Sequence, residues 1–316
     1  MEKTRFTVAI SAYNIENYVK RAIDSVLNQT FKNYELLVID DCSTDSTMKV
    51  IEEIVGEKAK ILQTKKNSGT AAASRNIAIE NAKGEYLLFL DGDDELYSNE
   101  TLKEIDEHIK ENKYDIIYFG YENVGHTENY YRISTKENST REARLICDES
   151  FSVSSKVWNV EFLRNNNIRF KEGMYYEDEL FSIKSNILSK VTTYGEFAIF
   201  KYHRNREGSV MTKPTVKKCS DWYRMVAEVT DLYEITPEED RKYLLSFLKN
   251  ESDSIPLRVE NIIEALRENR KTKVLPKRNY KFILNGDESS FKDLEQQLDK
   301  DLYKKIKELY IYYKSK

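Results

Sequence analysis

Two periods of hydrophobic residues alternate over the first hundred positions of the chain. Short β-branched or aromatic runs at residues 6–10, 35–39, 60–63 and 85–90 are typical of buried parallel strands. Between them, apolar residues recur at helical spacing over residues 18–27, 48–54 and 70–82. This alternation predicts right-handed βαβ units and an α/β fold with a mostly parallel central sheet flanked by helices.

The rest of the chain is less regular and becomes helical towards its end. Helices are expected over residues 97–112, 156–165 and 178–188, and strands over 115–119 and 192–202. Further helices are expected near residues 216–233, 237–249, 254–270 and 290–313. We therefore expect an α/β domain over residues 1–212 and a helical C-terminal region over residues 213–316.

Composition narrows the classes of protein to consider. The chain has 316 residues, of which 40% are hydrophobic and 33% charged, so it can bury a core and is not a disordered chain. Its formal net charge of −4 does not favour nucleic acid as a partner. No apolar run is long enough to span a bilayer, and the first residues do not resemble a secretion signal. Together with three scattered cysteines, this predicts a cytoplasmic protein without a disulfide framework.

Polar residues follow each predicted strand of the first hundred residues. These segments cover residues 11–14, 40–45, 67–76 and 91–94. In open α/β sheets, ligands bind at the carboxyl ends of the strands, so these segments are candidates for one binding site.

The residue types in these segments suit a nucleoside diphosphate with a divalent cation. The ring of Tyr13 can stack on a base, and Arg75 can pair with phosphate. Asp91 and Asp93 offer hard oxygen ligands to Mg²⁺ or Mn²⁺. The intervening Gly92 is expected to let the backbone turn so that both carboxylates face one ion.

Two stretches of the chain resemble the family 2 glycosyltransferases, which have the GT-A fold. They read AYNIENYVKRAIDSVLNQTFKNYELLVIDDCSTDST and NSGTAAASRNIAIENAKGEYLLFLDGDDEL. The resemblance is strong over about the first hundred residues and continues weakly at residues 175–179 and 202–211. It implies a nucleotide-binding half over residues 1–96 and an acceptor half over residues 97–212.

The resemblance also implies a role for individual residues. Ser11 and Tyr13 correspond to uracil contacts, Asp41 to the carboxylate on the uracil ring nitrogen, Arg75 to an arginine near the nucleotide, Asp91 to the acid near the ribose or sugar, Asp93 to the metal ligand, Asp178 to the catalytic base, and Arg204, Arg206 and Ser209 to groups covering the diphosphate. Asp91 and His203 are further candidates for the metal. Ser11 replaces a usual proline, and Cys42 replaces a usual glycine, which is expected to change the turn or tighten the uracil pocket.

The function implied by the resemblance is inverting transfer of a hexose or N-acetylhexosamine from a UDP-sugar. Mn²⁺ or Mg²⁺ assists as the cofactor, and the acceptor is a hydroxyl of a glycan or lipid-linked glycan. The alternative is a non-catalytic nucleotide-sugar-binding or scaffold subunit of a transferase complex. A dinucleotide-dependent dehydrogenase is excluded, because SAYNIEN lacks a glycine-rich turn after the first strand.

Several of these residues also have purely structural interpretations. Asp40 and Asp94 can cap the helices or turns that follow them, and Glu177 and Glu179 can complement the dipole of a helix start. His203 can be a packing histidine. Apolar residues and lysines near the C-terminus predict core packing, a homo-oligomer contact or peripheral binding to an anionic membrane surface.

Overall fold

The computed structural model describes residues 3–110, 112–125, 130–132, 152–203, 221–222, 224–225, 228–229 and 231–244. The chain divides into two compact units. The first comprises Met1–Gly173 with Glu177–Glu207, and the second comprises Met174–Tyr176 with Gly208–Lys316. The first unit contains most of the predicted functional residues.

The strands and helices follow one another in an alternating order over the first half of the chain. The strands are β1 (Phe6–Ala12), β2 (Tyr34–Asp40), β3 (Lys60–Gln63), β4 (Tyr86–Asp91), β5 (Glu95–Leu96), β6 (Ile116–Val124), β7 (Tyr130–Arg132), β8 (Lys156–Asn159) and β9 (Thr192–His203). The helices are α1 (Val19–Leu27), α2 (Thr47–Val55), α3 (Ala72–Asn81), α4 (Thr101–Ile109), α6 (Val160–Asn165) and α7 (Glu177–Leu188), with short 3₁₀ turns η1 (Gly56–Lys58) and η4 (Leu232–Ile235).

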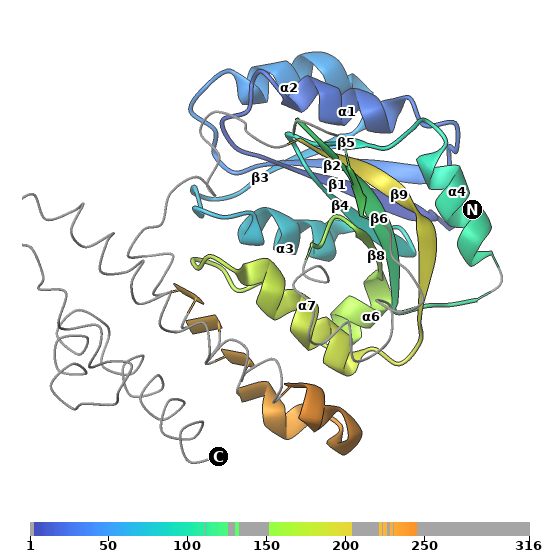
Figure 1. The fold of residues 1–316 in the computed structure, drawn as a ribbon. Helices are drawn as coiled ribbons and strands as arrows, with labels where there is room; N and C mark the ends of the chain where they lie inside the picture. Colours follow the sequence, from blue (N-terminus) through green and yellow to red (C-terminus); the bar gives the residue numbers. More distant parts are fainter. Residues whose placement is uncertain are drawn as a thin grey trace, which may run out of the picture. The chain divides into compact units, whose positions relative to one another are not determined.

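The strands form one sheet with the order β3-β2-β1-β4-β8-β6-β9-β5, and β7 pairs with β6 (Figure 1). The pairs β3–β2, β2–β1 and β1–β4 are parallel, as the βαβ pattern predicts. The other half is mixed, because β8 runs antiparallel to both β4 and β6. The carboxyl ends of β1, β2 and β4 therefore lie side by side at one edge.

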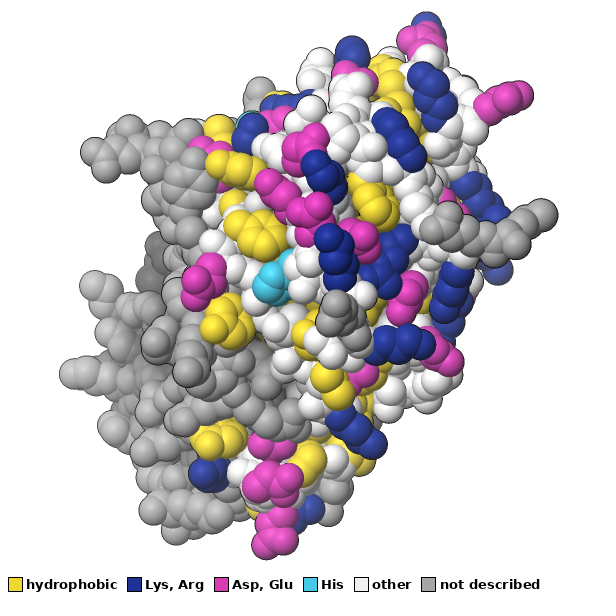
Figure 2. All heavy atoms as spheres, turned by 90° about the vertical axis from the view of Figure 1, so that its right-hand side faces the viewer, with side chains coloured by type: hydrophobic (Ala, Val, Ile, Leu, Met, Phe, Trp, Pro, Cys, Tyr) yellow, Lys and Arg dark blue, Asp and Glu magenta, His cyan; other side chains and the backbone are white. Residues whose placement is uncertain are grey.

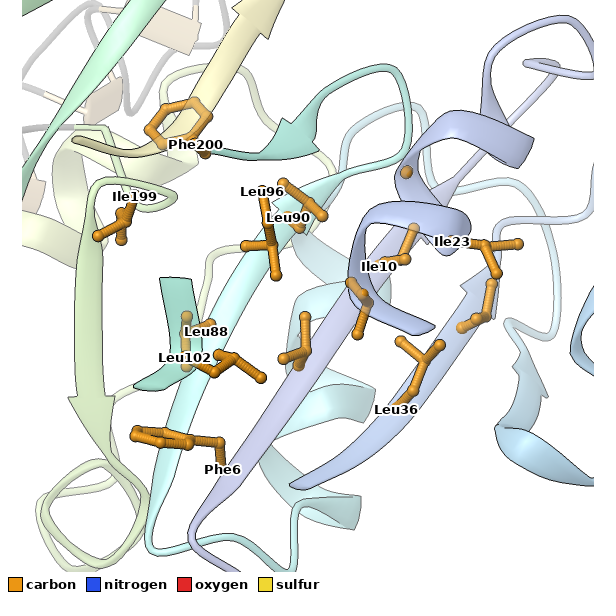
Figure 3. Close-up of a cluster of buried hydrophobic side chains, with 14 of the residues drawn as sticks. Phe6, Ile10, Ile23, Leu36, Leu88, Leu90, Leu96, Leu102, Ile199 and Phe200 are labelled. Atoms are coloured by element: carbon orange, nitrogen blue, oxygen red, sulfur yellow. The ribbon is translucent and has the colours of Figure 1, made fainter. Parts of the chain in front are cut away.

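Two hydrophobic cores hold helices against the two faces of this sheet (Figure 1). Helices α1, α2 and α4 cover one face, where Phe6 and Ile10 of β1 meet Ile23 of α1 and Leu102 of α4 (Figure 3). Helices α3, α6 and α7 cover the other face, where Trp158 of β8 is fully buried. Burial on both faces explains the continuous apolar runs of the central strands.

The expected α/β fold is confirmed, and one element was predicted wrongly. Residues 156–165 were expected to form a single helix, but Lys156–Asn159 is a strand and only Val160–Asn165 is helical. The Asn159 side chain accepts a hydrogen bond from Phe162 N, so it caps α6 and marks the change from strand to helix. Pairing with both β4 and β6 stabilises the short strand.

The second unit is described only in part. Tyr175 N donates to the buried Asp221 Oδ2 at 3.0 Å, and Trp222, Met225 and Val229 are buried. The predicted domain boundary at residues 212 and 213 and most of the predicted C-terminal helices lie outside the described residues, so they stay predictions.

The charges on the surface and the lengths of the helices bear on two possible partners, nucleic acid and a lipid bilayer. On the face seen in Figure 2, lysines and arginines are interspersed with acidic side chains, so the described residues there form no continuous basic patch for nucleic acid. In the part of the chain that the structure describes, every helix is too short or too polar to cross a bilayer.

Candidate functional site

The carboxyl ends of three neighbouring strands form the floor of the candidate site. Ser11 of β1 lies opposite Asp91 of β4 in the parallel register. The main chains stay in contact beyond the strands, because Asp41 N donates to Ala12 O at 2.8 Å and Gly92 N donates to Ser11 O at 3.0 Å. The sheet therefore places the two predicted acidic segments on either side of one strand end.

Hydrogen bonds tie the loop after β1 to the loop after β2. Asn14 Oδ1 accepts from Thr44 N at 2.8 Å, and Asn14 N donates to Ser43 Oγ at 3.0 Å. Asn14 has a φ of 48°, a left-handed conformation that asparagine tolerates better than most residues. These contacts fix the loop that carries Tyr13, which is 43% exposed. An exposed ring on a fixed loop can stack on a planar base.

The carboxylate of Asp41 is buried and hydrogen bonded by the protein. Its Oδ1 accepts from Thr64 Oγ1 at 2.7 Å, and its Oδ2 accepts from the backbone N and the Oγ of Ser68, both at 3.0 Å. Asn67 Nδ2 also donates to Oδ2, at 3.3 Å. A carboxylate has about four acceptor positions on its two oxygens. Oδ1, which accepts one bond here, is therefore the oxygen with capacity for a ring N–H.

Cys42 keeps the backbone conformation that a glycine would adopt freely. Its φ is 59°, in the left-handed region, where a side chain costs roughly 1–2 kcal/mol. Its Sγ donates to Thr64 O at 3.1 Å and lies 3.6 Å from Thr64 Oγ1, the group that donates to Asp41. The thiol therefore lies behind the buried carboxylate of Asp41, and the left-handed turn is present without glycine.

The acidic segment after β4 is a tight turn packed against β1. Asp94 N donates to Asp91 O at 2.9 Å. Gly92 is not among the glycines with a positive φ, so the turn does not depend on a left-handed conformation. A Cβ at this position would lie 2.8 Å from Ser11 O and 2.4 Å from Ile15 Cδ1, so close packing excludes a side chain.

Strand β9 brings His203 to the same turn by pairing with β5. The buried Asp94 Oδ1 accepts from His203 N at 2.8 Å, and His203 Nε2 lies 2.9 Å from Glu95 Oε1. Burial and the negative charges of Asp91 and Asp93 raise the pKa of Asp94 well above its usual range. Asp94 therefore fastens β9 to the turn, and one ring nitrogen of His203 is engaged by Glu95.

Arg75 of α3 connects the turn after β4 with the start of α7. Its Nη2 donates to Asp91 Oδ1 at 2.8 Å, and its Nη1 donates to Glu177 Oε1 at 3.4 Å. The guanidinium is buried and lies 5.4 Å from the centre of the Phe170 ring. Burial acts to lower the pKa of Arg75, but the negative charges of Asp91, Glu177 and Asp178 outweigh it and raise the pKa. Arg75 therefore serves two carboxylates from segments far apart in sequence.

Two adjacent carboxyl groups at the start of α7 have perturbed proton affinities. Burial raises the pKa of Glu177 to about 7, and the negative charge of Asp178 adds to this effect while Arg75 opposes it. Burial also raises the pKa of Asp178, against the opposing charge of Arg75. Asp178 Oδ1 accepts from Glu179 N at 3.0 Å, and its side chain is partly exposed. A carboxyl group whose pKa is raised above its ordinary value suits general-base chemistry.

The raised pKa of Glu177 predicts a dependence of stability on pH. A carboxyl group with a higher pKa in the folded state contributes its full stability below its ordinary value of 4.5 and loses it as the pH rises through about 7. We expect Glu177→Gln to remove this loss. The unfolding free energy of E177Q minus that of wild type should therefore increase as the pH rises from 4.5 to 7. Urea unfolding across that range measures it, with the exposed acid Glu52→Gln as the control. Parallel curves for wild type and E177Q would contradict the assignment.

The carboxylates at the turn after β4 suit a divalent cation that takes its other ligands from a bound diphosphate. Among the described residues, no group of three or more His, Cys, Asp and Glu side chains is arranged to hold a metal by itself. Asp91 and Asp93 supply hard carboxylate oxygens, and Mg²⁺ is usually bound by one or two carboxylates together with substrate phosphates and water. The site therefore fits a divalent cation bridging the protein and a diphosphate.

The structure brings most of the predicted site residues together. The connected set follows the strand ends and the starts of α3 and α7: Ser11, Tyr13, Asp41, Arg75, Asp91, Asp93, Asp178 and His203. Arg204, Arg206 and Ser209 lie outside the described residues. The individual roles in binding and catalysis stay predictions. In this structure the guanidinium of Arg75 faces carboxylates of the protein.

Sequence analysis missed the importance of Glu177. It was interpreted as an acid that only complements the helix dipole, but it is 8% exposed and bonded to Arg75. Its place on the apolar face of α7, three residues before Leu180, was the available signal. Asn67 and Ser68 lie in the segment 67–76 that was expected to contribute to the site, but Thr64 was missed, because an ordinary polar side chain in a loop carries no distinctive pattern.

Comparisons with known proteins identify the family of this chain. A family model described as "Glycosyl transferase family 2" matches residues 7–191. Poly(ribitol-phosphate) beta-N-acetylglucosaminyltransferase TarS of Staphylococcus aureus is 30% identical over 230 residues, which cover 70% of this chain and 39% of TarS. The match therefore spans about two fifths of the length of that relative.

Solved structures with the same fold include two with a bound sugar nucleotide. S. aureus TarS 1–349 in complex with UDP-GlcNAc superposes with a TM-score of 0.67 at 21% identity, covering 98% of this chain and 92% of that one. The mannosyltransferase PcManGT from Pyrobaculum calidifontis, in complex with GDP-Man and Mn²⁺, gives a TM-score of 0.58 at 14% identity, covering 99% and 86%. These likenesses confirm the GT-A fold.

Proposed function

Because the chain belongs to glycosyl transferase family 2, we propose that it transfers a hexose or N-acetylhexosamine from a UDP-sugar to a hydroxyl of a glycan, with inversion. The observation that carries this proposal is the bridge made by Arg75. It joins Asp91, at the turn suited to a diphosphate and its cation, to the acidic start of α7. This bridge would hold the donor site and the candidate base at one edge of the sheet.

The nucleotide is proposed to bind over the ends of β1 and β2. Tyr13 would stack on the uracil, Ser11 would line the pocket, and Asp41 Oδ1 would accept the hydrogen bond of the ring N–H. Since Asp41 is already fixed by Thr64 and Ser68, it would bind without rearranging its own loop. A buried carboxylate that accepts a hydrogen bond from uracil would discriminate against bases that lack a donor at that point.

Asp93, with Asp91 and His203 as further candidates, is proposed to hold Mn²⁺ or Mg²⁺. Such an ion, when bound, stabilises the negative charge on the departing diphosphate. Arg204, Arg206 and Ser209 would lie over the same diphosphate. The Mn²⁺ in the PcManGT complex supports the choice of ion.

Asp178 is proposed to be the catalytic base. Its carboxylate would take the proton of the acceptor hydroxyl while that oxygen forms a bond to the anomeric carbon and the bond from that carbon to UDP breaks. Because attack comes from the side opposite the leaving group, an α-linked donor gives a β-linked product. One base suffices, since no covalent intermediate forms.

UDP-GlcNAc is the first donor to test, and a poly(ribitol-phosphate)-like wall polymer is the first acceptor. The name of TarS and its UDP-GlcNAc complex support both choices. We also propose that the protein is cytoplasmic. Its C-terminal region would contact the inner face of the membrane or another copy of the chain. The alternative is a subunit that binds nucleotide sugar without catalysis.

A two-step experiment tests the proposal. Thermal shifts are measured with UDP-, GDP-, CDP- and TDP-sugars in the presence of Mn²⁺, because binding to the folded state raises stability by RT ln(1 + [L]/Kd). Release of UDP from the best donor is then followed with and without acceptor. A shift with UDP release supports a transferase, a shift without any turnover supports the binding subunit, and no shift with any donor excludes both.

Removing the metal ion, or the carboxylate proposed to bind it, should strongly reduce the rise in melting temperature that the donor causes. We expect EDTA, or Asp93→Asn, to reduce the UDP-GlcNAc shift to below a fifth of its value with Mn²⁺, because the diphosphate then lacks its counter-ion. Asp24→Asn, at an exposed acid of α1 that pairs with Lys20, is the matched control. An undiminished shift in D93N would remove Asp93 from the site.

A further inference from the structure

A lysine of strand β8 is buried beneath helix α7. Lys156 is 1% exposed and lies opposite Tyr118 of β6 in the sheet. Its Nζ donates to Ser152 O and lies 5.7 Å from the ring centres of Tyr118 and Trp158. Within the described residues, no carboxylate forms an ion pair with it. Burying an ammonium group without an ion pair costs free energy, so its presence calls for an explanation.

The two rings beside this lysine also contact α7. Trp158 packs edge-on against Phe181 with ring centres 5.0 Å apart, and the Tyr118 hydroxyl donates to Asn186 Oδ1. Residues three, four, seven and eight positions apart lie on one side of a helix, so Asp178 shares the face of Phe181 and Asn186. That face is turned towards β6 and β8, where Lys156 lies.

The charges around Asp178 come from four elements. Among the described residues they are Glu177 and Glu179 of α7 itself, Arg75 of α3, Asp91 of β4 and Lys156 of β8. Arg75 is hydrogen bonded to Glu177 and Asp91. Burial lowers the pKa of Lys156 to about 7, while the negative charge of Asp178 acts in the opposite direction. The negative charge of Asp178 therefore acts on the ammonium group of Lys156.

We infer that Lys156 is a positioning residue for the proposed base. Its ammonium group, held between Tyr118 and Trp158, stabilises the carboxylate of Asp178 from the side of the sheet, as Arg75 does for Glu177 from α3. This inference rests on the proposed function, since it assigns Lys156 a part in the transfer reaction. It explains why a buried cation is present where an apolar side chain of the same length would pack at lower cost.

Lys156→Met tests the inference, because methionine keeps the length of the side chain and removes the charge. We expect the melting temperature to equal or exceed that of wild type, and the affinity for UDP to stay within twofold. The acid limb of the pH profile of kcat/KM should move up by about one pH unit, because Asp178 then holds its proton more tightly. The transfer rate should therefore fall more at low pH than at high pH.

Tyr118→Phe is the matched control for packing. It keeps the ring beside Lys156 and removes the hydroxyl that donates to Asn186, so it should lower stability without moving the acid limb. An unchanged profile in K156M, or a loss equal at every pH with a lowered melting temperature, would overturn the inference.

A double-mutant cycle tests the inferred interaction between Lys156 and Asp178 without measuring any activity. Wild type, K156M, D178N and the double variant are unfolded by urea at pH 6.5, which lies below the pKa of about 7 of the buried Lys156. The folding constant of the double variant should exceed the product expected from the single changes by at least threefold. Additive effects would refute the interaction. If the wild type transfers no sugar, the proposed function fails while the cycle still decides whether Lys156 and Asp178 interact.

Discussion

Asp178→Asn is expected to lower sugar transfer by about 10²–10⁴-fold while UDP binding stays within about twofold of wild type. Asparagine has the same shape as aspartate and can still accept the hydrogen bond from Glu179 N, so the start of α7 should keep its structure. What is lost is the ability to take a proton from the acceptor hydroxyl. Steady-state transfer and UDP titration calorimetry, both with Mn²⁺, separate the two quantities.

Glu179→Gln is the matched control for this experiment. It removes one negative charge from the same helical turn, one residue further along, and should leave transfer within about threefold of wild type. If D178N retains the wild-type rate, Asp178 is not the base. If E179Q loses as much as D178N, the turn responds to charge in general and the assignment to one carboxylate fails.

The part of the candidate site at the ends of β1, β2 and β4 could be predicted from sequence because its signals are local. Each of β1, β2 and β4 is a short apolar run followed at once by polar residues, and parallel pairing of neighbours is the expected result of βαβ units. Ser11, Tyr13, Asp41 and Asp91 were therefore placed at one edge without reference to distant parts of the chain.

The part of the candidate site around Arg75, α7 and β8 could not be predicted in the same detail, because its contacts join residues that are distant in sequence. Arg75 was expected to meet phosphate, yet its observed partner Glu177 is 102 positions away. Strand β8 has only four residues, and its pairing with β4 and β6 overrides the helical pattern that continues into α6. Lys156 belongs to that short strand, so its burial could not be inferred while the segment was interpreted as a helix.

Arg75→Met should have the largest effect on stability of any single change at the site. It would leave the buried Glu177 without its cation, and breaking such a buried pair costs about 3 kcal/mol. The loss should be smaller at pH 5 than at pH 8, because protonation removes the charge of Glu177, whose pKa burial has already raised to about 7. Urea unfolding at the two pH values measures both effects.

Arg5→Met is the matched control, because Arg5 also bonds two carboxylates, Glu85 and Asp106, at the opposite end of β1. Those acids are 17% and 26% exposed, so water compensates more of the lost contact, and a cost of about 1 kcal/mol or less is expected. Arg75→Lys should rescue R75M only in part, since one ammonium cannot present the two separate donors of a guanidinium. Equal losses for R75M and R5M, without dependence on pH, would mean that Arg75 is an ordinary structural arginine. A larger, pH-dependent loss for R75M would instead identify the guanidinium as the group that holds the turn after β4 and the start of α7 together.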